Sequence, residues 1–250
     1  SAHSGALSLN TRWKLAQKAF ATTAAYDPAI ANSLEGMDLP AAGMHHAAAF
    51  KDEFPSALRL AYPLAQTLRY GENPHQRAAL YHDGSGTGVA AAEQLQGKEL
   101  SYNNLVDLDA CWALAQEFDE PMVAIIKHTN PCGAATGADV LDAYRKALVA
   151  DPVSAFGSVI GCNREVNGDA AEEMAALFVE AIAAPGFTAD ARARFAAKKN
   201  LRLVVVRGGE QKRVLKQVSG GLLLQDADLG RVSASEIKTV TKRVPTKEEL

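Results

Sequence analysis

The chain has 250 residues, of which 48% are hydrophobic and 22% charged, a composition that is ordinary for a packed globular protein and excludes a disordered one. Its formal net charge of −3 argues against a nucleic-acid binder and against a protein that lies on a membrane surface, because both classes carry a basic excess. No apolar run reaches the length of about 18 residues that a membrane-spanning helix needs, so we expect none. At about 150 residues per domain, the length predicts between one and two domains.

The three cysteines, Cys111, Cys132 and Cys162, are widely spaced, and no two of them form a Cys-x-x-Cys pair. A zinc ribbon and a dithiol redox motif are therefore excluded, and we expect all three side chains to be small buried apolar groups. Sparse cysteine usage is typical of a reducing compartment. Because the chain also opens without the pattern of a secretory signal, we expect a cytoplasmic protein.

The apolar pattern predicts a long helix near the start of the chain and a domain boundary after it. Apolar side chains recur with a period near 3.6 over residues 9–34. Residues 35–60 contain scattered glycine and proline, and we interpret them as a connector. At the other end, Thr246 and Glu249 have the spacing of a capping box that starts a helix. A single helical turn is not stable alone, so we expect the chain to be a piece of a longer polypeptide.

Residues 61–250 alternate between short apolar segments and segments of helical periodicity. The predicted strands cover residues 64–70, 78–82, 122–126, 158–162, 182–184, 201–207, 220–224 and 237–240. The predicted helices cover residues 104–118, 138–150, 169–180 and 188–199. Alternation at this spacing is typical of β-α-β units, and it predicts an α/β fold in which helices cover the faces of a sheet.

Two basic residues, Lys127 and His128, follow the buried strand predicted over 122–126. The C-terminal end of a buried strand in an α/β sheet is the usual place for ligands. An imidazole can accept a proton near neutral pH, and an ammonium group can stabilise a developing oxyanion or protonate a leaving nitrogen. The alternative is a surface lysine beside a histidine that is bonded to the backbone, and the residue types leave both interpretations open.

Two further polar segments are candidate binding elements. Arg69 offers a fork for a phosphate or carboxylate and Tyr70 an aromatic face or a hydroxyl, although Arg69 could equally pair with Glu72 in a turn. Asn104 stands at the start of a predicted helix, where its side chain can cap the helix or bind polar groups of a ligand.

A zinc deaminase is a third possibility, because Pro131-Cys132 resembles half of the Pro-Cys-x-x-Cys element of those enzymes. Ala135 occupies the position of the second cysteine, and no His-x-Glu precedes it. His45 and His46 are adjacent, which is a poor spacing for chelation from a helix. We therefore expect no catalytic metal. The sequence also lacks a P-loop and a Gly-x-Ser-x-Gly element.

Five segments, in the same order along the chain, resemble the bifunctional purine-biosynthesis family that carries AICAR transformylase and IMP cyclohydrolase. They are LRYGENPHQ (68–76), LSYNNLVDLDACW (100–112), IIKHTNPCGAATG (125–137), DPVSAFGSVIGCNREV (151–166) and TVTKR (239–243). The resemblance implies that residues 1–60 are the last helices of the cyclohydrolase domain with a linker. It implies that residues 61–250 are the first, cytidine-deaminase-like half of the transformylase domain, a layered α-β-α fold.

The resemblance also implies an activity, which is formyl transfer from the co-substrate 10-formyltetrahydrofolate to the 5-amino group of AICAR. It assigns proton acceptance to His128, and charge stabilisation or protonation of the leaving nitrogen to Lys127. The nucleotide contacts that it implies are Arg69, Tyr70, Asn104, Gly157 and Glu180. No catalytic metal is implied.

The same resemblance implies a homodimer with its site at the subunit interface, and small molecules rather than nucleic acid or membrane as partners. It assigns most folate contacts to a second half of the transformylase domain, so we expect little activity from this chain alone. A non-catalytic nucleotide-binding fragment and a deaminase-like hydrolase are the alternatives.

Overall fold

The computed structural model describes residues 6–35, 54–209, 212–233 and 235–247. Most of the predicted connector, together with His45, His46 and Glu249, lies outside these residues. The chain divides into two compact units, residues 1–67 with 79–85, and residues 68–78 with 86–250. Within the described ranges, no helix combines the length and the apolar character needed to cross a membrane.

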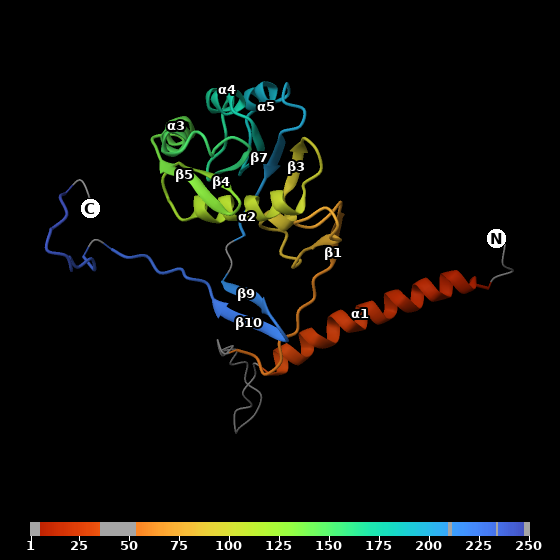
Figure 1. Cartoon of the computed structure of the whole chain (residues 1–250). Helices are drawn as coiled ribbons and strands as arrows, with labels where there is room; N and C mark the ends of the chain where they lie inside the picture. Colours follow the sequence, from red (N-terminus) through yellow and green to blue (C-terminus); the bar gives the residue numbers. More distant parts are fainter. Residues whose placement is uncertain (1–5, 36–53, 210–211, 234, 248–250) are drawn as a thin grey trace. The chain divides into compact units, whose positions relative to one another are not determined.

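The first unit contains the long helix predicted over 9–34, which is confirmed as α1 (Leu9–Glu35; Figure 1). None of its described residues is buried. Near its end, the Arg59 guanidinium donates hydrogen bonds to Glu35 at 2.9 Å and to Asn32 at 3.2 Å. Two strands, β1 (Leu64–Leu68) and β2 (Ala78–Tyr81), form a two-stranded sheet where strands were predicted.

The second unit is built on a six-stranded mixed sheet of order β3-β8-β7-β6-β4-β5. Strands β6, β7 and β8 are parallel, whereas β4 runs antiparallel to both of its neighbours and β3 antiparallel to β8. The predicted α/β class is thus confirmed. The strands of this sheet are β3 (Glu93–Gln96), β4 (Met122–Lys127), β5 (Asn130–Thr136), β6 (Ser158–Cys162), β7 (Val179–Ala184) and β8 (Arg202–Val205). The other elements are a 3₁₀ turn η1 (Val89–Ala91), the helices α2 (Tyr102–Gln116), α3 (Val140–Ala150), α4 (Gly168–Ala176) and α5 (Ala189–Phe195), and a hairpin of β9 (Arg213–Val218) and β10 (Gly221–Asp226).

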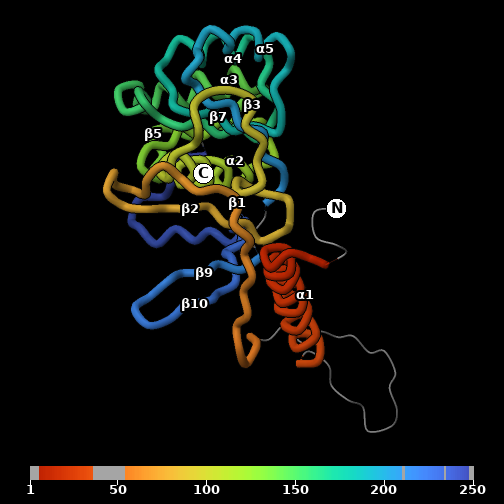
Figure 2. Tube along the Cα trace, turned by 90° about the vertical axis from the view of Figure 1, so that its right-hand side faces the viewer, coloured from red at the N-terminus to blue at the C-terminus, as the bar shows by residue number. Residues whose placement is uncertain are grey.

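Helices cover both faces of this sheet, with α2 on one face and α3, α4 and α5 on the other (Figures 1 and 2). Successive side chains of β4 point to opposite faces, as the pleat of a strand requires. Val123 and Ile125 pack in the cluster that contains Tyr144 of α3, whereas Ile126 packs in the cluster that contains Leu108 of α2. Both faces are therefore buried, which explains why β4 is a continuous apolar run.

Several predicted elements differ from the structure. Residues 177–180 were predicted to be helical, but α4 ends at Ala176 and Val179 already belongs to the buried strand β7. The strand predicted over 237–240 is not formed, and β3, β5 and β9 were not predicted. Strand β5 was missed because Pro131 and Gly133 are typical of loops. At the edge of the sheet, however, a proline need not donate a hydrogen bond to a further strand.

All three cysteines are free, and two of them, Cys111 and Cys162, are buried as predicted. Cys132 is only half-buried, so the prediction is wrong for that residue. Burial raises the pKa of Cys162 to about 12 and raises the pKa of Cys111 well above its ordinary value. Because the thiolate is the reactive form, neither buried thiol is suited to act as a nucleophile.

Candidate functional site

A cavity of about 990 Å³ lies in the second unit. It is at the end of the sheet where β4 terminates and where the strands β6, β7 and β8 begin. A cavity of this size can enclose a ligand as large as a nucleotide. Six of the seven residues predicted for the site line it, namely Arg69, Tyr70, Asn104, His128, Gly157 and Glu180. The seventh, Lys127, is not among the lining residues.

His128 lies in the two-residue turn that joins β4 to β5, where Lys127 pairs with Asn130. Both central residues of the turn have positive φ, 53° for His128 and 61° for Thr129. Turns with two positive φ angles normally contain Asn or Gly, because other side chains are strained there. The His128 side chain forms no hydrogen bond with any described residue, so it is not the backbone-bonded histidine of the alternative interpretation.

Lys127 is placed differently from its neighbour. Its ammonium group donates a hydrogen bond of 2.9 Å to the carbonyl oxygen of Phe156. Phe156 and Gly157 both line the cavity, so the positive charge of Lys127 acts on the peptide group of the cavity wall. His128 therefore lines the cavity itself, whereas Lys127 contacts a backbone carbonyl of the cavity wall.

Asn104 caps a helix, which is one of the two functions that the sequence left open. Its backbone amide donates to Ser101 Oγ at 3.2 Å and its Oδ1 accepts from the Ser101 amide at 3.1 Å, which forms a capping box at the start of α2. Its Nδ2 group has no partner among the described residues, and the residue lines the cavity. That amide group is consequently a free donor for a ligand.

Gly157 lies in the loop that enters β6, with φ of 77°. Its amide donates to the Phe178 carbonyl at 2.8 Å, and the rings of Phe156 and Phe178 contact each other with centroids 5.1 Å apart. A Cβ atom at Gly157 would meet no atom closer than 3.8 Å, so its positive φ, not crowding, requires glycine. Hydrogen bonds from Ser154 hold the pKa of Asp151, which begins this loop, below its ordinary value.

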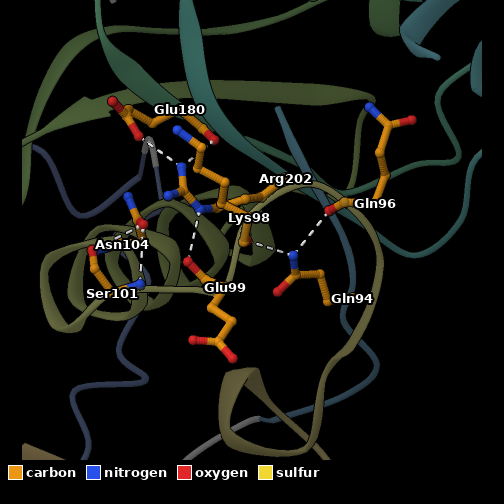
Figure 3. A network of polar contacts seen from close by, with 8 residues as sticks. All are labelled: Gln94, Gln96, Lys98, Glu99, Ser101, Asn104, Glu180 and Arg202. Carbon is orange, nitrogen blue, oxygen red and sulfur yellow. Dashed lines mark hydrogen bonds and ion pairs between the residues drawn. The ribbon is translucent and has the colours of Figure 1, made fainter. Parts of the chain in front are cut away.

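Glu180 is held by a buried arginine (Figure 3). Arg202 Nη1 lies 2.7 Å from Glu180 Oε2 and donates to the Glu180 carbonyl at 3.2 Å, while Nε donates to the Glu99 carbonyl at 3.2 Å. The side chain of Arg202 is 8% exposed and that of Glu180 is 37% exposed. The carboxylate therefore faces the cavity in an orientation that Arg202 determines.

Arg69 and Tyr70 stand together at the cavity, with the guanidinium carbon 5.5 Å from the centroid of the tyrosine ring. A guanidinium at this distance over an aromatic face is held by a cation–π contact. Among the described residues, Arg69 forms no ion pair with Glu72, so its fork is available to an anion.

The family described as "AICARFT/IMPCHase bienzyme" matches residues 1–250. The chain belongs to this family. The resemblance found from the five sequence segments is thereby confirmed. The family is thus described by two activities, AICARFT and IMPCHase.

Individual relatives show the same relationship. The chain is 51% identical over 254 residues to the bifunctional purine biosynthesis protein PurH of Parvibaculum lavamentivorans, with 98% of this chain and 45% of that protein covered. It is 49% identical over 254 residues to the PurH protein of Rhodospirillum rubrum, with 100% and 46% covered. For the PurH protein of Acidithiobacillus ferrooxidans the identity is 46% over 249 residues, with 98% and 46% covered. The chain spans about half the length of these curated relatives.

Several cavity residues of this family member were not predicted from the sequence. They are Lys98, Asp107, Phe156, Lys198, Lys199 and Arg202. Arg202 could have been found from the sequence, because it is the basic residue of the apolar run 201–206. A basic residue in a buried strand needs hydrogen-bond acceptors nearby. With Arg69, the basic residues outnumber Asp107 and Glu180, so the cavity favours an anionic ligand.

No group of three His, Cys, Asp or Glu side chains gathers where it could hold a metal ion in the part of the chain that the structure describes. Cys132, whose motif resembles half of a deaminase element, packs against the core cluster that contains Tyr144 of α3.

The role of Arg202 gives a first prediction. We expect Arg202→Lys to lower the free energy of unfolding by about 1–2 kcal/mol, because one ammonium group cannot reach all three acceptors and leaves partly buried acceptors unpaired. Urea denaturation followed by circular dichroism measures the change. Arg207→Lys is the matched control, since Arg207 is exposed and its side chain forms no hydrogen bond with the described residues, and an equal loss in both variants would contradict the prediction.

Proposed function

We propose that this chain carries part of the AICAR transformylase site, which transfers a formyl group from 10-formyltetrahydrofolate to the 5-amino group of AICAR. One observation carries the proposal. In a chain of the AICARFT/IMPCHase family, residues from six separate segments, including His128, Asn104 and Glu180, line a single cavity. The basic lining is suited to the phosphate of a nucleotide.

In the proposed mechanism, His128 is the general base. The 5-amino nitrogen attacks the formyl carbon, the bond between that carbon and folate N10 breaks, and the proton lost by the amine goes to the His128 imidazole. The imidazolium then returns the proton to N10, so that the step is balanced without any further reagent. A free imidazole at the cavity can perform both transfers.

The remaining residues bind and orient the nucleotide. Lys127 supplies positive charge through the Phe156 carbonyl and thereby stabilises negative charge that develops on the formyl oxygen. Asn104 donates from its free amide group, and Gly157 allows the nucleotide to approach the backbone. Arg69 and Tyr70 bind at the phosphate or the ring, and Glu180 accepts from hydroxyl or amino groups.

The proposal extends to the domain organisation. We assign residues 1–60 to the end of the cyclohydrolase domain with a linker, and 61–250 to a cytidine-deaminase-like half of the transformylase domain. We also propose that the complete enzyme acts as a homodimer and takes only small-molecule substrates. Because the chain covers 46% of its relatives, binding of AICAR without turnover is the function we propose for the chain by itself.

The test compares the chain with the full-length protein. Formation of tetrahydrofolate from 10-formyltetrahydrofolate and AICAR is followed for both, and AICAR binding to the chain is measured by calorimetry. We expect turnover by the full-length protein and binding without appreciable turnover by the chain. Absence of turnover in the full-length protein would overturn the proposal, as would the absence of AICAR binding to both proteins.

A further inference from the structure

We propose that Asp107 is a positioning residue that holds His128 in its productive orientation by fixing the strained turn between β4 and β5. The inference rests on the proposed function of His128 and names a residue that acts through it. Asp107 lies on α2 and is remote in sequence from the turn, yet both line the same cavity.

The turn between β4 and β5 has a strained backbone. His128 and Thr129 have φ angles of 53° and 61°, and neither is glycine. Non-glycine residues are strained at positive φ, and a threonine, which is branched at Cβ, is especially unfavourable there. A turn built from these residues is expected to relax unless its surroundings hold it in place.

The hydrogen bonds of the turn show what holds it. The carbonyl of His128 accepts from Thr129 Oγ1 at 2.7 Å and from Asn130 Nδ2 at 2.8 Å, and both of these contacts lie inside the hairpin. The amide of Thr129 instead donates to Asp107 Oδ1 at 2.8 Å. This is the contact that connects the turn to α2, an element outside the hairpin.

Helix α2 is a rigid support for this contact. It begins with a capping box, and its buried residues Leu108, Cys111 and Trp112 pack in the same cluster as Ala124 and Ile126 of β4. Residues three apart on a helix share a face, so Asn104 and Asp107 both point toward the cavity. The same helical face thus provides a substrate donor and the support for the proposed base.

The experiment uses the full-length protein with four variants and steady-state formyl-transfer kinetics. Asp107→Ala removes the acceptor, whereas Asp107→Asn retains an oxygen that can accept from the Thr129 amide. We expect Asp107→Ala to lower kcat about 10- to 100-fold with KM for AICAR changed less than about threefold, because misplacement of a catalytic group by about 1 Å has effects of this size. We expect Asp107→Asn to retain kcat within about threefold.

Two variants test the strain directly. Glycine has no penalty at positive φ, so Thr129→Gly relieves the strain at this position, and the His128 carbonyl retains the hydrogen bond from Asn130 Nδ2 when the one from Thr129 Oγ1 is lost. We expect the double variant Asp107→Ala/Thr129→Gly to recover most of the kcat lost in Asp107→Ala. If Asp107→Asn is as impaired as Asp107→Ala, or if the double variant is no better than Asp107→Ala, the positioning role is overturned. A thermal unfolding midpoint unchanged among the variants shows that folding is not the cause.

A measurement that does not depend on activity separates this inference from the proposed function. Hydrogen exchange of the Thr129 amide is expected to be slow in the wild type and in Asp107→Asn, and faster in Asp107→Ala. Equal protection in all three would overturn the inference. If protection follows the expected order while His128→Ala leaves kcat unchanged, the contact stands and the proposed function fails.

Discussion

Replacing His128 by alanine in the full-length protein is expected to lower kcat for formyl transfer by about 10²–10⁴, the usual contribution of a general base. The imidazole has no hydrogen-bond partner among the described residues and lies at the cavity, so its removal breaks no hydrogen bond with the described part of the fold. The backbone contacts of the turn remain, and KM for AICAR is expected to change much less than kcat. Steady-state formation of tetrahydrofolate measures both constants.

His82→Ala is the matched control for this prediction. His82 is outside the cavity, and its ring accepts a hydrogen bond of 3.1 Å from the Gly84 amide in an exposed turn. Its replacement is expected to leave kcat and KM unchanged. An unaltered kcat in His128→Ala would rule out the role of His128 as the base, and an equal loss in both variants would point to a general loss of folded protein.

Replacing Gly133 by alanine is expected to lower the free energy of unfolding of the chain by about 3 kcal/mol, at the upper end of the usual cost of overpacking. An added Cβ would lie 1.9 Å from the Ala147 carbonyl oxygen and 2.8 Å from its carbon. These are backbone atoms of α3, so no side chain can turn aside to make room. Helix α3 would have to move away from β5, and the packing of Tyr144 in the core would be lost with it.

Gly221→Ala is the control for the stability measurement. At Gly221 an added Cβ would meet only the Val218 side chain, at 4.0 Å, and the backbone has no positive φ. Its effect on the free energy of unfolding is expected to stay within about 0.5 kcal/mol, as for most surface substitutions. Urea titration of both variants provides the comparison, and similar midpoints would show that α3 yields without cost.

The sequence predicted much of this fold because hydrophobic periodicity reports directly on burial. The helix over 9–34 and the strands over 122–126 and 158–162 were predicted close to their bounds. The prediction of secondary structure failed where the local pattern of residues allows more than one element and tertiary contacts decide between them. The stretch 177–180 has apolar residues compatible with either period, and only pairing with β6 and β8 makes it the start of a buried strand.

The sequence likewise predicted some features of the candidate site and missed others. Residue chemistry was enough to select Lys127, His128, Arg69 and Asn104 as polar groups beside predicted elements. It was not enough to separate Lys127 from His128, because the direction of each side chain depends on the positive φ angles of the turn. Nor could it find Asp107, whose role depends on a contact between α2 and the hairpin.

The sequence by itself therefore determined the α/β class, the motifs of the family and the kinds of chemical group available. Only the tertiary structure decided that β4 is antiparallel to β6. This direction brings the C-terminal end of β4 next to the N-terminal ends of β6, β7 and β8. The reason is physical. Periodicity records which face of an element is buried, whereas strand direction, edge position and the partner of a buried arginine depend on residues that are distant in the chain.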